Sequence, residues 1–414
     1  MNLLVGEKIN FPGKEILSTQ ILTMEEISEK YIRGDVRIIT EQARYPLNTI
    51  VTMLSSGDYN LNPEFQRRKR WSISKQSRLI ESFIMNVPIP PIFLYEVSYS
   101  RYEVMDGLQR LTAINEFYTG KFSLMGLDQW PELNGMYYST LPDQVRRGID
   151  RRYLSSIILL QETARNETEA TRLKQLVFER INSGGEKLEP QESRNALYNG
   201  PLNQLCIALA RTESFCKMWG IPTDSELEKH SSSDQASFQF DDDFELDAEV
   251  DILQRNAMYK KMQDVELVLR FFAYRQMSAA EQGRLRDFLD TYLKLGNLFS
   301  IDVLRQFEEL FIETSDFVYQ VLGERAFFLL RKRKNGKWGW FERPTKVLYD
   351  PLMYAFSKHI QHKQMLISKT PEIRNKLEEM YKSQADTFEG RSTNQQDVFR
   401  RMDLLEKFLG TFLE

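Results

Sequence analysis

The chain has 414 residues, of which 42% are hydrophobic, so it can bury a full core and is not a disordered polypeptide. Its 55 basic and 59 acidic residues give a net charge of -4, which excludes an overall basic nucleic-acid coat but leaves room for a local basic groove. Cys206 and Cys216 have no metal-binding spacing, so we expect both to be reduced packing residues. The first residues lack a signal pattern and no apolar run approaches the roughly 18 residues of a membrane helix, so we expect a soluble, cytoplasmic protein without a membrane partner.

The first third of the chain predicts an arm and then short helices. Residues 1–34 are expected to form an N-terminal arm. A short amphipathic helix is predicted over residues 45–54, and residues 62–67 are expected to be extended because the residue before a proline avoids the helical conformation. Ser74 is expected to cap a helix that the proline-rich residues 87–91 end.

Two strands and a helix follow. The short β-rich runs 92–95 and 102–105, separated by residues 97–101, indicate a hairpin-like pair of strands. Apolar residues then recur at helical spacing over residues 111–117. The Asp106-Gly107 pair is therefore expected to lie between the end of a strand and the start of a helix.

The remaining elements change from mixed to helical. Residues 156–160 predict another buried strand, and residues 167–181 predict a helix that stops at the glycine-containing loop 182–185. A new helix is expected near Pro190. From residue 202 to the end the patterns are almost all helical, and we detect no internal repeat.

Charge is unevenly distributed along the chain. Residues 60–112 contain eight Lys/Arg against five Asp/Glu, whereas residues 241–251 contain seven acidic residues and no basic one. This pattern favours an N-terminal half that faces phosphate groups. An ordinary mixed surface followed by a solvated acidic loop is the alternative interpretation.

The Asp106-Gly107 turn is the main candidate for a functional site. A helix N-terminus offers unpaired backbone N–H groups and a positive dipole end, which stabilise an anion. Arg110 could add a fork of donors to a phosphate. Asp106 could hold a magnesium ion through water or orient an attacking water, and a simple helix cap is the plain alternative.

Two further segments combine an arginine with an amide or a glycine-rich backbone, namely residues 65–67 and 178–185, which is suitable for holding a polyphosphate and a base. Together with the Asp106 turn and with residues 82–92, they resemble the N-terminal domain family of the GmrSD modification-dependent restriction endonucleases. That family is similar in fold to the ParB and sulfiredoxin nucleotide-binding domains. Residues 254–271 and 350–355 also look like the helical continuation of family members.

The resemblance implies a fold and a domain order. We expect an α+β chain in which a ParB/sulfiredoxin-like NTP-binding domain over residues 35–200 follows the N-terminal arm. A mostly α-helical domain over residues 201–414 is expected to complete the chain. It should contain a flexible acidic insertion at about residues 223–250.

The resemblance also implies a nucleotide-hydrolysing, DNA-linked protein of bacterial antiphage defence, in which an Asp-Gly-Gln-Gln-Arg motif is the hydrolytic centre. Asp106, Gln109 and Arg110 match the motif as catalytic residues, with Asp106 as the magnesium ligand. The implied nucleotide-binding residues are Gln66, Arg67, Gly107, Arg180, Asn182, Gly184 and Gly185.

One residue departs from the motif. Leu108 stands where the family usually has its first Gln, and an apolar side chain cannot orient water or hydrogen-bond a base. Either that Gln is dispensable or hydrolysis here is slowed or lost.

A nuclease site is less evident. In the family, DNA cutting is assigned to an additional His-Asn-His domain, which needs metal-ligating and base histidines. This chain has three histidines, none in such a pattern: His230, His359 and His362. We expect surface or packing roles for the last two, which lie three residues apart on a predicted helix. A magnesium ion held by Glu64, Glu103 and Asp106 keeps a ParB-like nuclease or nickase as an alternative, although exposed carboxylates without a metal are the favoured interpretation.

Basic residues beside aromatic ones provide candidate DNA contacts. Arg68, Lys69 and Arg70 precede Trp71, an arrangement that suits phosphate neutralisation and base stacking. The same run could serve the triphosphate, or be a plain solvated charge run. Residues 331–334 with Trp338 and Trp340 form a second such stretch with the same alternatives.

The main hypothesis is therefore an NTP-binding and NTP-hydrolysing component of a DNA-directed defence system, which uses Mg²⁺ and a nucleoside triphosphate of unspecified base. DNA is its expected macromolecular partner, with a separate nuclease or effector supplied in trans and a homo-oligomer allowed. The alternatives are a metal-dependent nuclease that uses the same turn and a nucleotide-gated DNA-binding module that does not hydrolyse.

Overall fold

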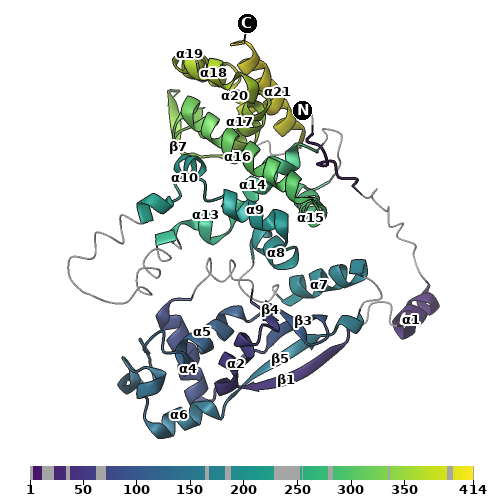
Figure 1. The fold of residues 1–414 in the computed structure, drawn as a ribbon, viewed down its shortest axis with the longest axis vertical. Helices are drawn as coiled ribbons and strands as arrows, with labels where there is room; N and C mark the ends of the chain where they lie inside the picture. The colour runs from purple at the N-terminus through teal and green to yellow at the C-terminus, as the bar shows by residue number, and fades with distance from the viewer. Residues whose placement is uncertain are drawn as a thin grey trace. The chain divides into compact units, whose positions relative to one another are not determined.

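The chain divides into two units that are described separately, Lys14–Leu188 and a helical unit made of Met1–Gly13 with Glu189–Glu414 (Figure 1). The computed structural model describes residues 3–11, 23–33, 38–61, 71–163, 167–181, 188–227, 252–253, 255–277, 283–333, 336–388 and 395–413.

A five-stranded mixed sheet is the centre of the first unit. Its strands are β1 (Thr40–Pro46), β2 (Tyr59–Asn60), β3 (Ile92–Ser98), β4 (Arg101–Asp106) and β5 (Tyr153–Leu159). They lie in the order β1-β5-β3-β4-β2. The β1–β5 and β3–β4 pairs are antiparallel, whereas β3–β5 and β2–β4 are parallel. The strand that ends at Asp106 is therefore an inner strand of the sheet.

Helices of the first unit cover both faces of this sheet, namely α2 (Ile50–Ser55), α4 (Ile73–Met85), α5 (Leu108–Tyr118), α6 (Asp143–Asp150) and α7 (Glu167–Ile181). A further helix, α1 (Met24–Arg33), has exposed side chains where they are described. Four short 3-10 turns accompany them, η1 (Leu47–Thr49), η2 (Pro131–Leu133), η3 (Tyr138–Thr140) and η4 (Gln161–Thr163).

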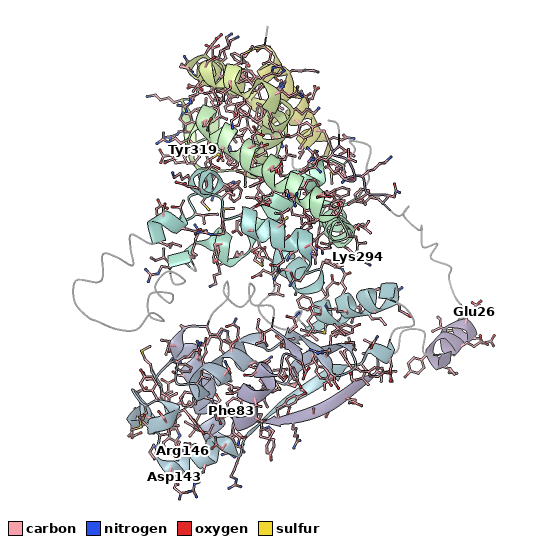
Figure 2. All side chains as sticks on the ribbon, in the orientation of Figure 1. Glu26, Phe83, Asp143, Arg146, Lys294 and Tyr319 are labelled. Carbon is pink, nitrogen blue, oxygen red and sulfur yellow. The ribbon has the colours of Figure 1, made fainter. Side chains whose placement is uncertain are left out.

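The main core of the first unit lies between the sheet and the helices α2, α4, α5 and α6. Alternate residues of the inner strands, such as Ile92 and Leu94 on β3, pack there against Phe83 of α4 and Phe117 of α5. Figure 2 shows Phe83 on α4, and Asp143 with Arg146 on α6. Burial of the apolar residues that recur along these helices holds them on this face of the sheet.

Local signals at the ends of α4 explain its length. Ser72, not the predicted Ser74, is the N-cap, because its side chain accepts a hydrogen bond from the Lys75 N–H. At the other end Asn86 adopts the left-handed conformation with φ of 59°, which asparagine tolerates better than most residues. The proline-rich segment then follows as predicted.

The helical unit contains most of the remaining helices of the chain. The described ones are α8 (Pro190–Leu197), α9 (Pro201–Leu209), α10 (Glu213–Trp219), α13 (Ala257–Lys260), α14 (Gln263–Tyr274), α15 (Leu285–Gly296), α16 (Ile301–Leu322), α17 (Lys346–Lys358), η7 (Ile360–His362), α18 (Lys363–Ser368), α19 (Thr370–Ser383), α20 (Ala385–Phe388) and α21 (Gln395–Gly410). A two-stranded antiparallel hairpin, β6 (Phe328–Lys332) with β7 (Trp338–Pro344), interrupts them.

Buried aromatic rings and ion pairs hold the helical unit together. Phe272 of α14 stacks on Phe307 of α16 with ring centroids 4.4 Å apart. Glu7, which is fully buried, receives two hydrogen bonds of 2.6 and 2.7 Å from Arg275. Because both side chains are buried, this bidentate pair compensates two charges that would otherwise be costly. It attaches the first residues of the chain to the helical unit.

The fold class predicted from the sequence is confirmed, with an α+β unit followed by a helical one. Three details differ from the prediction. Residues 45–46 belong to β1 and the helix begins only after them, β6 and β7 interrupt the region predicted as helical, and β1 and β2 were not predicted. The structure divides the chain at Leu188, whereas the predicted boundary lay at residue 200, and it groups Met1–Gly13 of the predicted arm with the helical unit.

Both cysteines are free and fully buried, as predicted. Burial raises the pKa of the Cys206 thiol, which therefore stays protonated. Within the described ranges, none of the helices has the length and apolar character needed to cross a bilayer. Residues 228–250 of the predicted acidic insertion lie outside the described residues.

Candidate functional site

The predicted strand–turn–helix is present at residues 101–118. β4 ends at Asp106, Gly107 has a φ of 95°, and α5 begins at Leu108. A Cβ atom on Gly107 would lie 2.3 Å from Cγ2 of Ile92, so both the backbone angle and the close packing on β3 require glycine. The first intrahelical hydrogen bond runs from the Leu111 N–H to the Gly107 carbonyl at 3.0 Å. The amides before Leu111 have no partner within the helix.

Asp106 and Arg110 form an ion pair across this helix start. Oδ2 of Asp106 accepts a hydrogen bond from Nη2 of Arg110 at 2.5 Å. The Arg110 side chain is only 13% exposed and that of Asp106 is 38% exposed, so a largely buried guanidinium meets a carboxylate that is open to solvent. The N-cap of α5 is Gly107, and no side chain caps the helix. The alternative interpretation of Asp106 as a helix cap is therefore wrong, because its carboxylate holds Arg110.

Gln109 is fixed by a backbone contact. Its Oε1 accepts a hydrogen bond from the Trp71 N–H at 3.0 Å, and because a backbone N–H can only donate, the amide nitrogen must point elsewhere. Nε2 of Gln109 and Nε of Arg110 are both buried without a hydrogen-bond partner among the described residues. Buried donors without partners are costly, and an oxygen-rich anion is the kind of ligand that would satisfy them.

Leu108, the departure from the family motif, is buried. Its side chain is 8% exposed, whereas Asp106 on the other side of Gly107 is open to solvent. The Leu108 side chain therefore lies inside the protein. Its carbonyl accepts a hydrogen bond from the Thr112 hydroxyl at 2.9 Å, within α5.

Glu103 pairs with a lysine of α7. Its carboxylate pairs with Nζ of Lys174 on α7 at 2.5 Å, and Lys174 also lies over the ring of Tyr95, 5.4 Å from its centroid. β4 has an irregularity between Val104 and Asp106, where Phe93 of β3 pairs with Asp106 and Leu94 pairs with Val104. Burial, together with the Glu103 carboxylate, raises the pKa of Tyr95. The predicted magnesium site of Glu64, Glu103 and Asp106 stays a prediction, because Glu64 lies outside the described residues.

The C-terminal end of α7 lies at the same end of the sheet as Asp106. The Lys174–Glu103 ion pair places these two residues side by side. From there, Arg180 lies about 9 Å further along α7, and Asp106 lies about 10 Å further along β4. Arg180 and Met105 line one cavity, which confirms that α7 and β4 run in the same direction. The structure therefore brings the predicted Arg180 towards the Asp106 end of β4.

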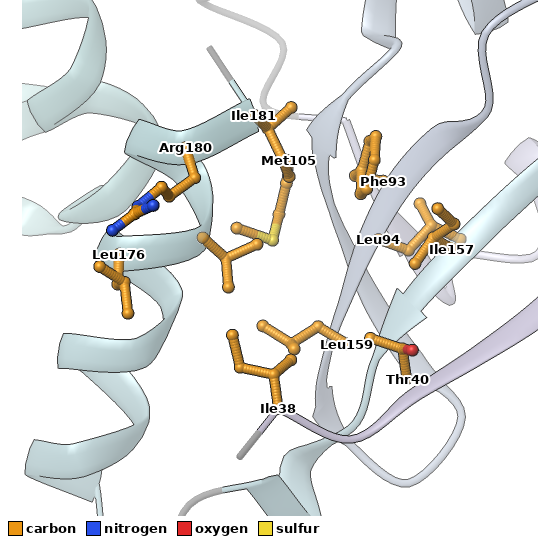
Figure 3. Close-up of a pocket in the computed structure, with 11 residues that line it drawn as sticks. Ile38, Thr40, Phe93, Leu94, Met105, Ile157, Leu159, Leu176, Arg180 and Ile181 are labelled. Carbon is orange, nitrogen blue, oxygen red and sulfur yellow. The ribbon is translucent and has the colours of Figure 1, made fainter. Parts of the chain in front are cut away.

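That cavity lies between the sheet and α7 and has a volume of about 380 Å³ (Figure 3). Its lining is mostly apolar and includes Phe93, Met105, Leu159, Leu176, Ile181 and the exposed Arg180. Such a surface suits an apolar group and not a triphosphate. The Asp106-Gly107 turn, with the first amides of α5, is the better candidate for binding a phosphate.

Several predicted residues lie outside the described part of the chain. They are Gln66, Arg67, Arg68, Lys69, Arg70, Asn182, Gly184 and Gly185. The described residues that border them are informative. Trp71 is bonded to Gln109, and Ile181 ends α7 at the Asp106 end of the sheet. Lys75 lies over the Trp71 ring, 4.6 Å from its centroid, and the ring packs against the main core, which gives Trp71 a structural role.

Two contacts of the site were not predicted from the sequence, the Trp71–Gln109 hydrogen bond and the Lys174–Glu103 ion pair. No local pattern pointed to Lys174, which lies 71 residues further along the chain.

His359 has a packing contact, His362 is exposed, and His230 lies outside the described residues. His359 follows the end of α17, and its Nε2 lies 3.3 Å from the Glu406 carbonyl of α21. Burial lowers the pKa of His359. Among the residues that the structure describes, no group of three or more His, Cys, Asp or Glu side chains could hold a metal ion together.

Fold and site together define an α+β domain with an acid–arginine pair at a strand–glycine–helix turn, an arrangement suited to binding an anion. Residues 47–199 match the family described as GmrSD restriction endonuclease, N-terminal domain, so this part of the chain belongs to that domain family. The match includes the whole turn and extends into α8 of the helical unit. No curated protein and no solved structure matches the chain. The ParB/sulfiredoxin likeness and the helical continuation beyond residue 199 stay predictions.

Proposed function

We propose that the first unit binds a nucleoside triphosphate with Mg²⁺ at the Asp106-Gly107 turn and hydrolyses it, as part of a DNA-directed, restriction-like defence system. The family match supports the DNA-directed, restriction-like part of this proposal. The observation that carries the nucleotide part is the pair of buried, unpartnered donors, Gln109 Nε2 and Arg110 Nε, beside the open carboxylate of Asp106.

Each residue of the turn has a distinct role in this proposal. The first amides of α5 and the guanidinium of Arg110 bind phosphate oxygens. Gln109, whose oxygen is bonded to Trp71, contributes its N–H donors to the ligand. Arg180, and the predicted residues Gln66, Arg67, Asn182, Gly184 and Gly185, would complete the nucleotide site from the two flanking segments.

The two carboxylate oxygens of Asp106 can have different roles. Oδ2 holds Arg110, and Oδ1 has no hydrogen-bond partner among the described residues. Oδ1 is therefore free to hold the metal, directly or through water, or to orient the attacking water. Bound Mg²⁺ would neutralise negative charge on the phosphates.

The test is phosphate release from ATP, GTP, CTP and UTP with Mg²⁺, with and without plasmid DNA, followed by a gel of the same reactions. Asp106→Asn keeps an acceptor for Arg110 but removes the charge, and should lower release by about 100-fold or more. The control is Asp143→Asn, which changes an aspartate of the same unit that pairs with Arg146 on α6.

The outcomes separate the proposal from its alternatives. Release that Asp106→Asn abolishes and Asp143→Asn preserves, with intact plasmid, supports it. Nucleotide binding without release from wild type overturns hydrolysis and identifies a nucleotide-gated module. Nicked or linear plasmid that depends on Asp106, without phosphate release, overturns the proposal in favour of a nuclease.

A further inference from the structure

The β6–β7 hairpin of the helical unit has two different faces. Trp340 packs edge-on against Tyr381 of α19, with ring centroids 6.5 Å apart, and Leu329 and Leu330 are buried at the base. In the antiparallel register Arg331 pairs with Gly339, and the neighbouring Leu330 pairs with Trp340. Residues one apart on a strand point to opposite faces, so Arg331 lies on the face away from Trp340. Arg331 and Phe341 share one face with the buried Leu329, and Leu330 shares the other face with Trp338 and Trp340.

This hairpin is strongly basic in a chain of net charge -4. Residues 331–343 contain six Lys/Arg and one Asp/Glu. Among the described residues, Lys332, Arg333 and Arg343 are exposed and form no ion pair with a carboxylate. Cations without local counter-charges produce a positive potential that attracts polyanions.

Three arginines of the hairpin are held in place by their neighbours. The guanidinium carbons of Arg331 and Arg343 lie 5.0 and 4.5 Å from the ring centroid of Phe341. The Arg333 side chain crosses Gly339, where a Cβ atom would lie 2.5 Å from its Nε. Stacking and this close approach restrict side chains that are otherwise mobile, so less entropy is lost when they bind.

The arginines of the hairpin suit contact with a string of phosphates. Arg331 lies in β6, and Arg333 follows the strand with its side chain across Gly339. Guanidinium groups on one hairpin can contact different phosphates of one nucleic-acid strand, each through a fork of donors. A lone small anion would use only one of them.

We propose that the β6–β7 hairpin is a duplex-DNA contact surface that binds the phosphate backbone without reading sequence. The choice of DNA rests on the proposed function, whereas the polyanion site rests on the hairpin alone. The hairpin belongs to the helical unit, whereas the Asp106 turn belongs to the first unit.

The test is fluorescence anisotropy of the full chain with a labelled DNA duplex over a range of salt concentrations. The variant Arg333→Gln/Arg343→Gln removes two exposed charges from the hairpin. The matched control, Lys294→Gln/Arg305→Gln, removes two exposed charges from α15 and α16 of the same unit. A second variant, Arg333→Lys/Arg343→Lys, keeps the charge and tests the role of the planar guanidinium groups.

The hairpin variant should bind DNA at least about tenfold more weakly, and its slope of log affinity against log salt should be shallower by about 1.8, the value for two lost phosphate contacts. The control should bind DNA with the affinity and salt slope of wild type. Unrelated duplex sequences should give the same results. The lysine variant should keep the salt slope and bind a few-fold more weakly than wild type.

Equal affinity and slope for the hairpin variant and wild type would overturn the proposal. The proposal would also be overturned if the wild-type protein failed to bind duplex DNA but bound an acidic peptide or anionic vesicles. Phosphate release, measured on the same variants, distinguishes this failure from that of the proposed function. Hairpin variants that lose DNA binding but retain Asp106-dependent release establish two separate sites, and salt-dependent DNA binding without release leaves the hairpin proposal intact.

Discussion

The carboxylate of Asp106 and the guanidinium of Arg110 are joined at 2.5 Å across the start of α5. This pair connects the last residue of an inner strand to the first turn of the helix that follows it. It also fixes the direction of the arginine before any ligand arrives. A guanidinium positioned in advance loses less entropy on binding a phosphate than a mobile one.

Replacing Arg110 with methionine tests whether the pair serves binding or stability. Methionine keeps the aliphatic stem and removes the charge. Because Asp106 is 38% exposed, the carboxylate left behind can be solvated, and we expect a loss of stability within about 1 kcal/mol. Nucleotide affinity should fall at least about tenfold, because a charged hydrogen bond to phosphate is lost. Thermal unfolding and equilibrium binding of a fluorescent nucleotide measure the two effects.

Arg146→Met is the control for this variant, since Arg146 also pairs with an aspartate, Asp143 at 2.9 Å on α6. It should change neither quantity appreciably. Unchanged nucleotide affinity in Arg110→Met, with lost stability, would show that the arginine is structural.

Gly107 should be intolerant of even a methyl group. Gly107→Ala meets two costs, a positive φ and a Cβ atom 2.3 Å from Ile92. Gly120→Ala meets only the first, because Gly120 has a φ of 73° with nothing within 4 Å of the added atom. We expect about 1 kcal/mol of destabilisation for Gly120→Ala and at least about 1 to 3 kcal/mol more for Gly107→Ala. Chemical denaturation of both variants measures the difference, and equal values would contradict the close packing of the turn on β3.

Leu108 offers a direct test of the departure from the family motif. Because its side chain is 8% exposed, the amide of Leu108→Gln would be buried, with a cost of about 1 to 3 kcal/mol. We expect lower stability and no gain in phosphate release. A faster release with an unchanged melting temperature would show that position 108 reaches the ligand and that the native leucine slows hydrolysis.

Elements with strong local signals could be predicted from the sequence. The Asp106-Gly107 turn was found because an Asp-Gly pair and a helical apolar period adjoin each other. β1 gave no such signal, since it is a largely exposed edge strand of polar residues that exists through pairing with β5, for example Thr40 with Leu159. Pairing between distant segments overrides a weak local preference.

Contacts between distant residues could not be predicted for the same reason. Glu7 and Arg275 are 268 positions apart, and nothing near Glu7 distinguishes it from a solvated carboxylate. At the site, the sequence identified Asp106 and Arg110 as functional candidates. Their mutual bond, and the contact by which Trp71 orients Gln109, depend on the folded backbone. Sequence pattern thus indicated which residues matter and left their partners open.

The last prediction concerns the buried ion-pair cluster around Glu266 in the helical unit. Glu266 bonds to Arg194 at 3.0 Å and to Lys346 at 3.1 Å. Burial by itself would raise the pKa of Glu266, but the charges of Lys346, Arg194 and Arg270 outweigh it, so the pKa lies below the ordinary value of 4.5. A carboxyl with a lowered pKa in the folded state stabilises that state fully above the unfolded value and loses this contribution as the pH falls through the folded value.

Glu266→Gln removes that contribution but leaves Arg194 paired with Asp290 and Arg270 paired with Asp350. We expect the variant to be about 1 to 3 kcal/mol less stable than wild type at neutral pH, because charged hydrogen bonds from Arg194 and Lys346 are lost. The difference in unfolding free energy between wild type and the variant should narrow as the pH falls below 4.5, because wild-type Glu266 then becomes protonated and loses its charge. Denaturant unfolding of both proteins between about pH 3 and 7 measures the gap. Glu308→Gln, at an exposed position of α16, should show no gap at any pH. A constant gap for Glu266→Gln across this range would mean that the charge of Glu266 is not what stabilises the cluster.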